Sequence, residues 1–397
     1  MVRLHGNDYR RGHPLSMAQR KVMRHIAACR TTALGGHVDE CDSCGHTRIS
    51  YNSCRDRHCP KCQARQQVEW LTERLERLLP VPYFHVVFTM PDLLNPLALR
   101  NKAVVYRILF DAASQTLLEI AKDPRHLGAE IGITALLHTW GQNLLFHPHL
   151  HCVVTGGGLS ADQTRWVPSR ERYLLPVKVL ARLFRGKFLA ALEGARKDGL
   201  LHFAGSTEDL SDPATWRTFK DKLYRTSWVV YSKPPFGGPE HVFHYLGRYT
   251  HRIAISNHRI TDIRDGKVTF IVKDYADNHR RKSLTLDAVE FLRRFLLHVL
   301  PHRFVRIRHY GLCAARNVHT KLATAQRLLA ETSGVPHSKT ASRSEPTHEP
   351  WWQRFLHLTG IDVMACPACT TGRLVRRRIV LPGTSVDLNS RAPPYAA

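Results

Sequence analysis

The arrangement of apolar and polar residues predicts three strands in the first half of the chain. Residues 83–90 and 131–140 are apolar almost throughout, which is typical of strands in the centre of a sheet. The run 151–155 is β-branched and apolar and predicts a third strand over 149–155, which the glycine run at 156–158 should end. The short segment 141–148 predicts a hairpin between the last two strands. We therefore expect these strands to share a sheet.

Apolar residues at helical spacing predict helices along the rest of the chain. Ser16 is a candidate N-cap for the first helix, which should run to about residue 30. Further helices are expected at or within 64–79, 97–121, 173–197, 240–252, 287–299 and 351–358.

The second half of the chain also carries strand signals. Asp265-Gly266 favours a two-residue turn, so the flanking segments 259–263 and 268–273 predict a hairpin. Residues 303–310 alternate basic with apolar side chains, which predicts a strand whose basic face either follows a phosphate backbone or simply faces solvent. The whole pattern is neither all-helical nor regularly alternating, and it indicates an α+β fold.

The charge balance adds a candidate partner. The 397-residue chain is long enough for two or three domains and carries 58 Lys and Arg against 33 Asp and Glu, a net charge of +25. A surplus of that size favours a polyanionic partner over charge that serves only solubility. No apolar run could span a bilayer, and the polar, basic N-terminus lacks the apolar core of a signal peptide. We therefore expect a cytoplasmic protein with no membrane partner.

Ten cysteines in a reducing compartment favour metal sites over disulfides. Two Cys-x-x-Cys motifs separated by 14 residues are typical of a zinc ribbon, in which four thiolates complete a structural site. The expected zinc ligands are Cys41, Cys44, Cys59 and Cys62. Basic side chains surround these motifs and favour nucleic acid as the ribbon's partner, with a solvated face as the alternative; they are Arg48, Arg55, Arg57 and Lys61.

Other potential ligands are left over. Cys54 and His58 could form part of a second site with His46 or Cys29, or could be a buried thiol and a surface imidazole. Cys366 and Cys369 form a lone motif whose missing ligands could come from His357 or Cys313, unless the motif is vestigial.

Two histidines in the third predicted strand suggest a different metal site. Side chains alternate along a strand, so His149 and His151 point to one face and Leu150 to the other. Two imidazoles on one face can bind one divalent ion, and the hairpin would bring His138 or Gln142 near them as a third ligand. The alternative is chance clustering in a chain with 25 histidines.

The predicted helix at 240–252 carries a pair of tyrosines. Tyr245 and Tyr249 are four residues apart and project from one face, with Arg248, His251 and Arg252 close by. A tyrosine pair at this spacing often serves only packing. Residues 331–350 are rich in Ser, Thr, Pro and His and predict a flexible linker. The chain contains no phosphate-binding loop motif, so we expect no ATPase activity.

Together, the zinc ribbon, the His-Leu-His strand and the Tyr-Leu-Gly-Arg-Tyr helix resemble the HUH two-tyrosine transposases of bacterial insertion sequences, which move by a rolling-circle route. The resemblance covers about residues 13–316, and 83–91 resembles the first conserved strand of HUH nucleases. It implies an HUH endonuclease fold, a central antiparallel sheet with packed helices and the histidine pair on a middle strand. The expected regions are a zinc-binding domain at 1–80, the nuclease at 81–316, and a helix, linker and small cysteine region at 317–397.

The resemblance also implies an activity. His149 and His151 correspond to metal ligands for Mg²⁺ or Mn²⁺, with Gln142 favoured as the third ligand and His138 and His147 as rivals. Tyr245 and Tyr249 correspond to nucleophiles that cleave single-stranded DNA, leaving a 5′-phosphotyrosine and a free 3′-OH. The expected partners are single-stranded DNA and hairpin ends of the element, bound in part by Arg248 and Arg252, together with a host helicase in the bacterial nucleoid.

Alternative functions share some of these features. A plasmid replication initiator or relaxase would use the same histidine pair and a tyrosine, although the ribbon and paired tyrosines argue against it. A zinc-dependent DNA-binding regulator would lack catalysis, and a metal-dependent hydrolase would lack the covalent step.

Overall fold

The computed structural model describes residues 1–233, 253–274, 277–278, 280–333 and 349–384. Its centre is an antiparallel sheet in the order β11-β4-β5-β3-β7, with β6 paired to β5. The strands are β3 (Tyr83–Thr89), β4 (Glu130–Trp140), β5 (Phe146–Leu159), β6 (Trp166–Pro168), β7 (Val229–Lys233) and β11 (Ile307–Gly311). The predicted α+β fold, with a central antiparallel sheet and the histidine pair on a middle strand, is confirmed.

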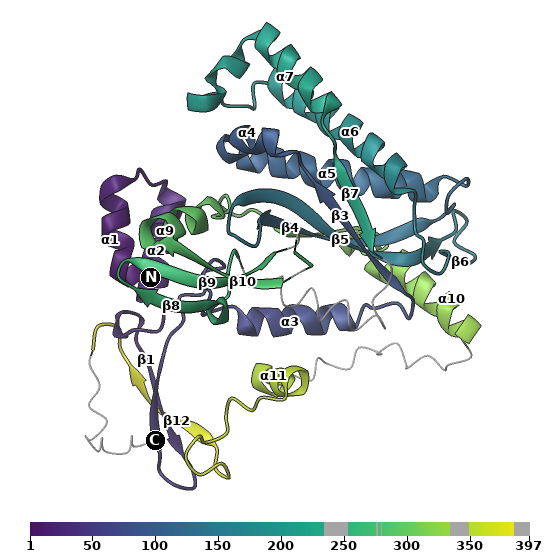
Figure 1. The fold of residues 1–397 in the computed structure, drawn as a ribbon. Coiled ribbons are helices and arrows are strands. Elements are labelled where there is room, and N and C mark those ends of the chain that lie inside the picture. Colours follow the sequence, from purple (N-terminus) through teal and green to yellow (C-terminus); the bar gives the residue numbers. More distant parts are fainter. Residues whose placement is uncertain (234–252, 275–276, 279, 334–348, 385–397) are drawn as a thin grey trace.

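Helices cover both faces of this sheet (Figure 1). The larger apolar core lies between the sheet and α4 (Asn95–Arg100), α5 (Lys102–Lys122) and α6 (Val177–Lys197). Leu150 of β5 is fully buried in it. The smaller core lies on the opposite face, where Val153 packs with residues at and near α3 (Ala64–Leu75) and α10 (Ala323–Ser333). Alternation along β5 therefore sends successive side chains into two separate cores.

A second sheet contains β8 (Ile260–Arg264), β9 (Lys267–Asp274) and β10 (Arg280–Asp287). The predicted turn at Asp265-Gly266 is confirmed, because both residues have positive φ as a type I′ turn requires. Helix α9 (Ala288–Leu297) follows β10, and α1 (Val2–Gly12) and α2 (Met17–Ala28) pack nearby. Ser16 caps α2 through a reciprocal pair of hydrogen bonds with Gln19, as its sequence position predicts.

A third sheet unites the two ends of the chain. β1 (Gly36–Cys41) pairs with β2 (Thr47–Tyr51) on one side and with β12 (Leu374–Val380) on the other. This sheet projects away from the central sheet (Figure 1). Its strands come from the first and the last of the three predicted regions, and the structure joins them in one sheet. Helix α11 (Trp351–Thr359) precedes β12 along the chain.

Two local expectations are corrected. The glycines at 156–158 do not end β5, which continues to Leu159. A Cβ atom on Gly156 would lie 2.6 Å from the carbonyl oxygen of Pro82, and one on Gly158 would lie 2.5 Å from that of Glu130. These glycines therefore allow backbones to approach closely within the sheet.

The predicted helix at 97–121 is two helices that meet at Asn101, whose backbone is not helical, with φ −119° and ψ 40°. The side chain of Asn101 hydrogen-bonds with the backbone of His202. The predicted linker begins later than expected, since α10 runs to Ser333. The rest of the linker at 334–348 and the predicted helix at 240–252 lie outside the described residues.

Sequence patterns missed several short or polar elements. These are α1, α7 (Pro213–Arg225), β1, β2, β6, β7, β10 and β12. Within the described part of the chain, no helix is long and apolar enough to cross a membrane.

Lys102 gives a test of the packing between α5 and α9. Its Nζ donates to the carbonyl oxygens of Leu297 and Val299 at 2.7 and 3.0 Å, and burial lowers the pKa of Lys102 from 10.5 to about 8. We expect Lys102→Met to lower the free energy of unfolding by about 1–3 kcal/mol at pH 7, because it leaves two buried carbonyls without their donor. Denaturant unfolding measures this loss.

The pH dependence of that loss has a definite sign. Between pH 8 and 10.5 the unfolded chain binds the Lys102 proton and the folded chain does not, so Lys102 adds stability as the pH rises. The stability difference between wild type and Lys102→Met should grow across this window, whereas the exposed Lys122→Met should match wild type throughout. If the stability difference between wild type and Lys102→Met stays constant with pH, the pKa of Lys102 is not lowered by burial.

Candidate functional site

The two histidines of β5 converge as expected. The Nε2 atoms of His149 and His151 lie 3.0 Å apart, on the face of the sheet that carries the smaller core. Two imidazoles that bind one ion at about 2.1 Å and at right angles would have their nitrogens about 3.0 Å apart. The pair therefore fits a single divalent ion.

Hydrogen bonds fix the orientation of both rings. Nδ1 of His149 donates to the carbonyl oxygen of His147 at 2.7 Å. Nδ1 of His151 lies 2.7 Å from Nε2 of His85, a buried side chain on the neighbouring strand β3. Because a carbonyl oxygen can only accept, the proton of neutral His149 is on Nδ1 and its Nε2 carries a lone pair. Nε2 of His151 carries a lone pair as well when its Nδ1 donates to His85. Sequence reasoning missed His85. The available signal was that His85 is two residues from Val87 on β3, so both side chains lie on one face, and Val87 is the cross-strand partner of His151.

A third imidazole completes what we call the histidine cluster, formed by His138, His149 and His151. His138 of β4 is the cross-strand partner of His149, and one ring nitrogen from each of the three residues lies within 4.8 Å of the others. Its ring centroid is 4.2 Å from that of His151. The structure thus brings together the pair and one of the rivals considered for the third position.

The other two candidates lie elsewhere in the hairpin. Gln142 is in the turn beyond the Trp140–Phe146 pair, and its carbonyl oxygen accepts from Arg259 at 2.6 Å. His147 is outside the histidine cluster, with its Nδ1 3.4 Å from Oδ1 of Asp92.

Burial keeps the histidine cluster neutral. Desolvation lowers the pKa of His149 to about 4 and places the pKa values of His138 and His151 well below their usual range. Near pH 7 all three are neutral imidazoles, the form that binds a metal ion. The cluster therefore suits a cation that supplies the charge itself.

The sheet surface beside the histidine cluster is open. Tyr231 of β7 and His151 of β5 both pair with Val87 of β3, so the three side chains form a row across one face. Tyr231 is 51% exposed and Val229 is 54% exposed, in contrast to the buried residues of the opposite face. The chain leaves β7 at Lys233; the predicted residues Tyr245, Arg248, Tyr249 and Arg252 follow and lie outside the described residues.

The cysteines form two clusters, and the predicted grouping of four zinc ligands is wrong. The inner cysteine cluster contains Cys29, Cys54, Cys59 and Cys62, and the outer cysteine cluster contains Cys41, Cys44, Cys366 and Cys369. The hairpin explains the separation. Its base is the Gly36–Tyr51 pair, while Cys41 is at its tip, about 17 Å away at 3.4 Å per residue.

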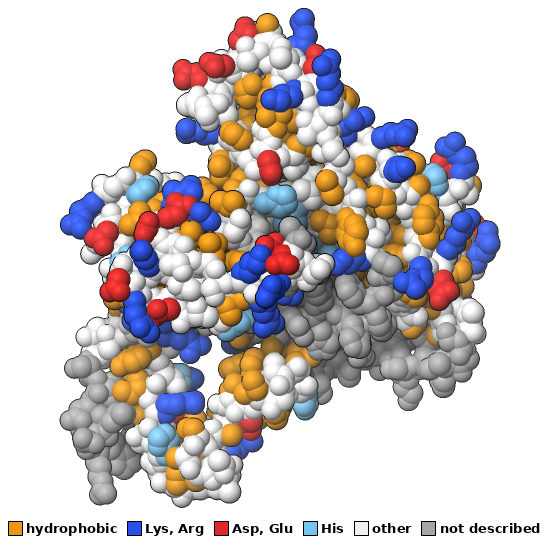
Figure 2. All heavy atoms as spheres, in the orientation of Figure 1, with side chains coloured by type: hydrophobic (Ala, Val, Ile, Leu, Met, Phe, Trp, Pro, Cys, Tyr) orange, Lys and Arg blue, Asp and Glu red, His pale blue; other side chains and the backbone are white. Residues whose placement is uncertain are grey.

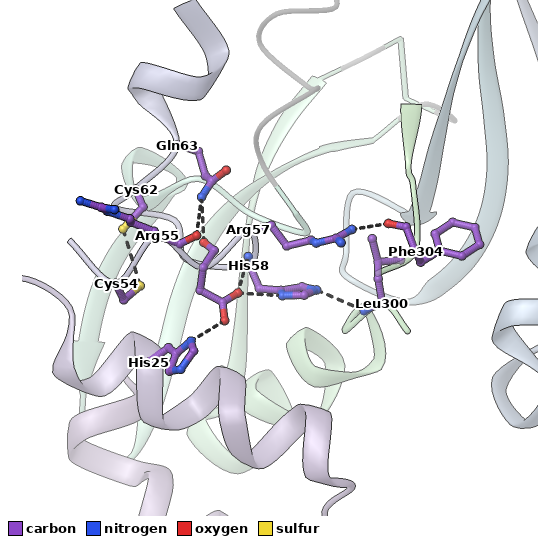
Figure 3. A network of polar contacts seen from close by, with 10 residues as sticks. His25, Cys54, Arg55, Arg57, His58, Cys62, Gln63, Leu300 and Phe304 are labelled. Carbon is purple, nitrogen blue, oxygen red and sulfur yellow. Dashed lines mark hydrogen bonds and ion pairs between the residues drawn. The ribbon is translucent and has the colours of Figure 1, made fainter. Parts of the chain in front are cut away.

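Polar contacts join the inner cluster to the body of the protein (Figure 3). Asp56 accepts 2.9 Å hydrogen bonds from Nδ1 of His25 and of His58, and Nε2 of His58 accepts from the amide of Leu300 at 3.1 Å. Burial opposes ionisation of Asp56, but the bonds from His58 and His25 outweigh it and lower its pKa to about 2. His58, expected as a surface imidazole or a spare ligand, is a buried hydrogen-bonding residue.

The predicted DNA-binding residues of this region take different positions. Arg55 is exposed, and Arg57 donates to the carbonyl oxygen of Phe304. Arg48 lies on β2, 3.6 Å from Asp39, and Lys61 is exposed beside the inner cluster. The expected basic strand at 303–310 is shorter, and its Arg306 is buried, so that segment presents less basic surface than expected.

A basic cavity of about 1240 Å³ lies between α2, the Cys54–His58 loop and residues 299–303. Among the described residues of its wall, Asp56 is the one carboxylate, and two histidines already contact it. The basic lining residues are Arg10, Arg20, Lys21, Arg24, Arg55, Arg57 and Arg303. Lys and Arg side chains are also spread over the face seen in Figure 2.

Comparison with protein families identifies the class. Residues 1–90 match a model described as a transposase zinc-binding domain, and residues 132–321 match one described as a putative transposase. These matches define a transposase, a nucleic-acid-processing enzyme that binds DNA. The matched zinc-binding domain and the cysteine clusters support structural zinc.

Two relatives identify the family. The chain is 51% identical over 376 residues to "Putative transposase y4qJ" of Sinorhizobium fredii (strain NBRC 101917 / NGR234), with 94% of this chain and 93% of the relative covered. It is 29% identical over 312 residues to "Transposase for insertion sequence element IS801" of Pseudomonas savastanoi pv. phaseolicola, with 75% and 70% covered. The chain belongs to the IS91/IS801 family of insertion-sequence transposases. No solved structure matches it.

Asp56 gives a test of the polar contacts in Figure 3. Asp56→Asn keeps the shape but removes the charge that His25 and His58 contact, and we expect it to lower the free energy of unfolding by about 1.5–3 kcal/mol. Asp198→Asn, at an exposed site after α6, should change it by less than about 0.5 kcal/mol. Equal effects of the two substitutions in chemical denaturation would show that the network adds no stability.

Proposed function

We propose that this transposase nicks and rejoins single-stranded DNA through 5′-phosphotyrosine intermediates. The proposed nucleophiles are Tyr245 and Tyr249, and the proposed ligands of a catalytic Mg²⁺ or Mn²⁺ are His149, His151 and a third residue. The observation that carries the proposal is that the Nε2 atoms of His149 and His151 converge to 3.0 Å, while Nδ1 of each ring has a hydrogen-bond partner of its own.

The position of β7 supports the role of the tyrosines. β7 lies two strands from β5, which corresponds to about 10 Å across the sheet. Tyr245 follows Lys233, the last residue of β7, by only 12 positions along the chain. Twelve residues span at most about 40 Å when fully extended, which is enough for Tyr245 to reach the face that carries His149 and His151.

The chemistry is a transesterification. The phenolic oxygen of one tyrosine attacks the phosphorus, so that a Tyr O–P bond forms and the P–O3′ bond breaks. The phenol loses its proton and the leaving 3′ oxygen gains one, giving a 5′-phosphotyrosine and a free 3′-OH. A divalent ion on the histidine cluster would supply Lewis-acid stabilisation of charge on the transferred phosphate. Arg248 and His251 are candidates to favour the ionised form of a phenol whose ordinary pKa is about 10.

Paired nucleophiles suit strand exchange. While one tyrosine holds a cleaved strand, the other can cleave a second strand, and each free 3′-OH can then attack the opposite phosphotyrosine. Each exchange conserves the energy of the phosphodiester bond, so neither cleavage nor rejoining requires ATP. Unwinding of the donor DNA would fall to a host helicase.

For the third metal ligand we propose His138 in place of Gln142. A cross-strand partner lies about 5 Å away, which puts the His138 ring directly against the pair. Gln142 is four residues beyond His138, the cross-strand partner of His149, which corresponds to roughly 14 Å at 3.4 Å per residue. A glutamine side chain is too short to span that separation.

Two surfaces support the proposed DNA contacts: the exposed side chains of β7 beside the histidine cluster, and the basic cavity. Tyr231 offers an exposed ring beside the histidine cluster, and Lys233 lies 5.7 Å from its centroid, a combination that suits a stacked base and its phosphate. The basic cavity can hold a hairpin or subterminal DNA segment through backbone charge. Recognition and cleavage would then use different surfaces of the chain.

A covalent adduct tests the nucleophiles. Labelled single-stranded DNA from the flank of the gene, incubated with the protein and Mn²⁺, should give an adduct that survives a denaturing gel. Tyr245→Phe and Tyr249→Phe should each retain some adduct, the double variant should have none, and His149→Ala should lose about 100-fold or more, since Lewis-acid stabilisation contributes several kcal/mol.

The control for that experiment is Tyr224→Phe on α7, an exposed tyrosine outside the site, which should behave as wild type. DNA binding without an adduct, on any strand and with either metal, rejects the catalytic proposal and leaves a zinc-dependent DNA-binding protein.

Metal affinity tests the third ligand. We expect His138→Ala to weaken Mn²⁺ binding by about 100-fold or more and Gln142→Ala to change it by less than about twofold, because only the imidazole reaches the ion. Titration calorimetry on zinc-loaded protein measures both, with the exposed His126→Ala as control. The reverse order of effects would restore Gln142 as the ligand.

A further inference from the structure

We propose that the outer cysteine cluster binds a second structural zinc ion, which fastens the C-terminal segment to the N-terminal hairpin. The family match for the zinc-binding domain ends at residue 90, so Cys366 and Cys369 lie outside it. Cys44 and Cys366 are separated by 322 positions. The site is therefore assembled only when both ends of the chain are folded together.

The sulfur positions fit a tetrahedral ion. The Sγ atoms of Cys41 and Cys369 are 3.6 Å apart, and those of Cys44 and Cys366 are 3.8 Å apart. Four thiolates at about 2.3 Å from zinc would have their sulfurs about 3.8 Å apart. A disulfide requires about 2.05 Å, and all four cysteines are free.

Backbone amides surround these sulfurs. The amides of Ser43 and Cys44 point to Sγ of Cys41 at 3.4 and 3.5 Å. The amides of Ala368 and Gly372 do the same for Cys366 and Cys369, at 3.4 and 3.3 Å respectively. Amide donors stabilise thiolates, the form that binds zinc. Both Cys-x-x-Cys turns therefore have the conformation of metal-binding knuckles.

The two knuckles fit closely together. A Cβ atom on Gly372 would lie 2.4 Å from Sγ of Cys41, so only glycine is accommodated there. Asp42 exchanges hydrogen bonds with the backbone of Arg373, donating from its amide at 3.0 Å and accepting on Oδ1 at 2.7 Å. From this point β12 pairs with β1, beginning at the Cys41–Leu374 pair.

The apolar cluster beside the β12-β1-β2 sheet buries too few side chains to stabilise this part of the chain by itself. Its apolar cluster has three buried members, Cys41, Cys366 and Leu374, and two of them are candidate ligands. Ile379 on β12 is 74% exposed. Without a hydrophobic core, small units of this kind depend on metal for their folding energy.

The inner cysteine cluster is a separate site. Sγ of Cys62 lies 3.3 Å from that of Cys29 and 3.6 Å from that of Cys54. Two sites of four thiolates use eight of the ten cysteines and leave Cys152 and Cys313 free. The inference does not depend on the proposed catalytic activity.

Zinc content tests the proposal. Wild-type protein should contain two zinc ions per chain by mass spectrometry, and X-ray absorption should show four sulfur ligands around each. Cys366→Ser with Cys369→Ser should leave one ion, as should Cys29→Ser with Cys54→Ser, while the control Cys313→Ser should keep two. One ion in the wild type, nitrogen or oxygen ligands in place of sulfur, or two ions retained by the Cys366/Cys369 variant would each overturn it.

Hydrogen exchange tests whether the proposed zinc ion stabilises the pairing of β12 with β1. In the Cys366/Cys369 variant the amides of β12 and its partner β1 should exchange at least about tenfold faster, while those of β5 stay protected. If the variant cannot be purified, the wild-type zinc count and sulfur coordination still decide the proposal. Unchanged protection of β12 would show that the pairing stands without a metal.

Discussion

Cross-strand pairing in the central sheet is the constraint on which the candidate active site depends. β5 lies between β4 and β3, and each neighbour contributes an imidazole: His138 opposite His149, and His85 in contact with His151. Because sides alternate along a strand, a slip of one residue would send His149 and His151 into the larger core and Leu150 to the opposite face. The apolar core and the proposed metal site therefore require the same register.

The glycine run adds a second restraint on that register. Gly156 and Gly158 let the backbones of Pro82 and Glu130 approach more closely than any side chain would allow. A shifted β5 would place Thr155 or Leu159 at these contacts, where a Cβ atom cannot fit. Close backbone contact at one end of the strand thus helps to hold the histidines at the other end.

Local signals in the sequence were sufficient for part of the structure. The cap at Ser16, the turn at Asp265-Gly266 and the shared face of His149 and His151 each depend on neighbours within a few residues. The choice between His138 and Gln142 depends on how far the hairpin extends before it turns, which composition does not encode. The cysteine grouping depends on the length of the β1–β2 hairpin and on a partner more than 300 positions away, so motif spacing alone predicted the wrong set. The roles of Tyr245 and Tyr249 came from family resemblance, and they remain proposals.

The same polar contacts that anchor the inner cluster also shape the basic cavity. Asp56, Arg57 and His58 belong to the cavity wall. His58 bonds the backbone of Leu300, which also lines the cavity, and Arg57 bonds the backbone of Phe304, which follows the lining residue Arg303. A wall held by directional hydrogen bonds keeps its geometry only while each donor and acceptor is satisfied, since buried unpaired polar groups cost free energy. Zinc at the inner cluster would fix Cys54 and Cys59, the two residues that bracket this loop. Loss of that metal would therefore disturb the cavity before it disturbed the central sheet, whose core is built from apolar side chains. The proposed DNA binding in the cavity and the proposed cleavage at the histidine cluster would then differ in their dependence on zinc.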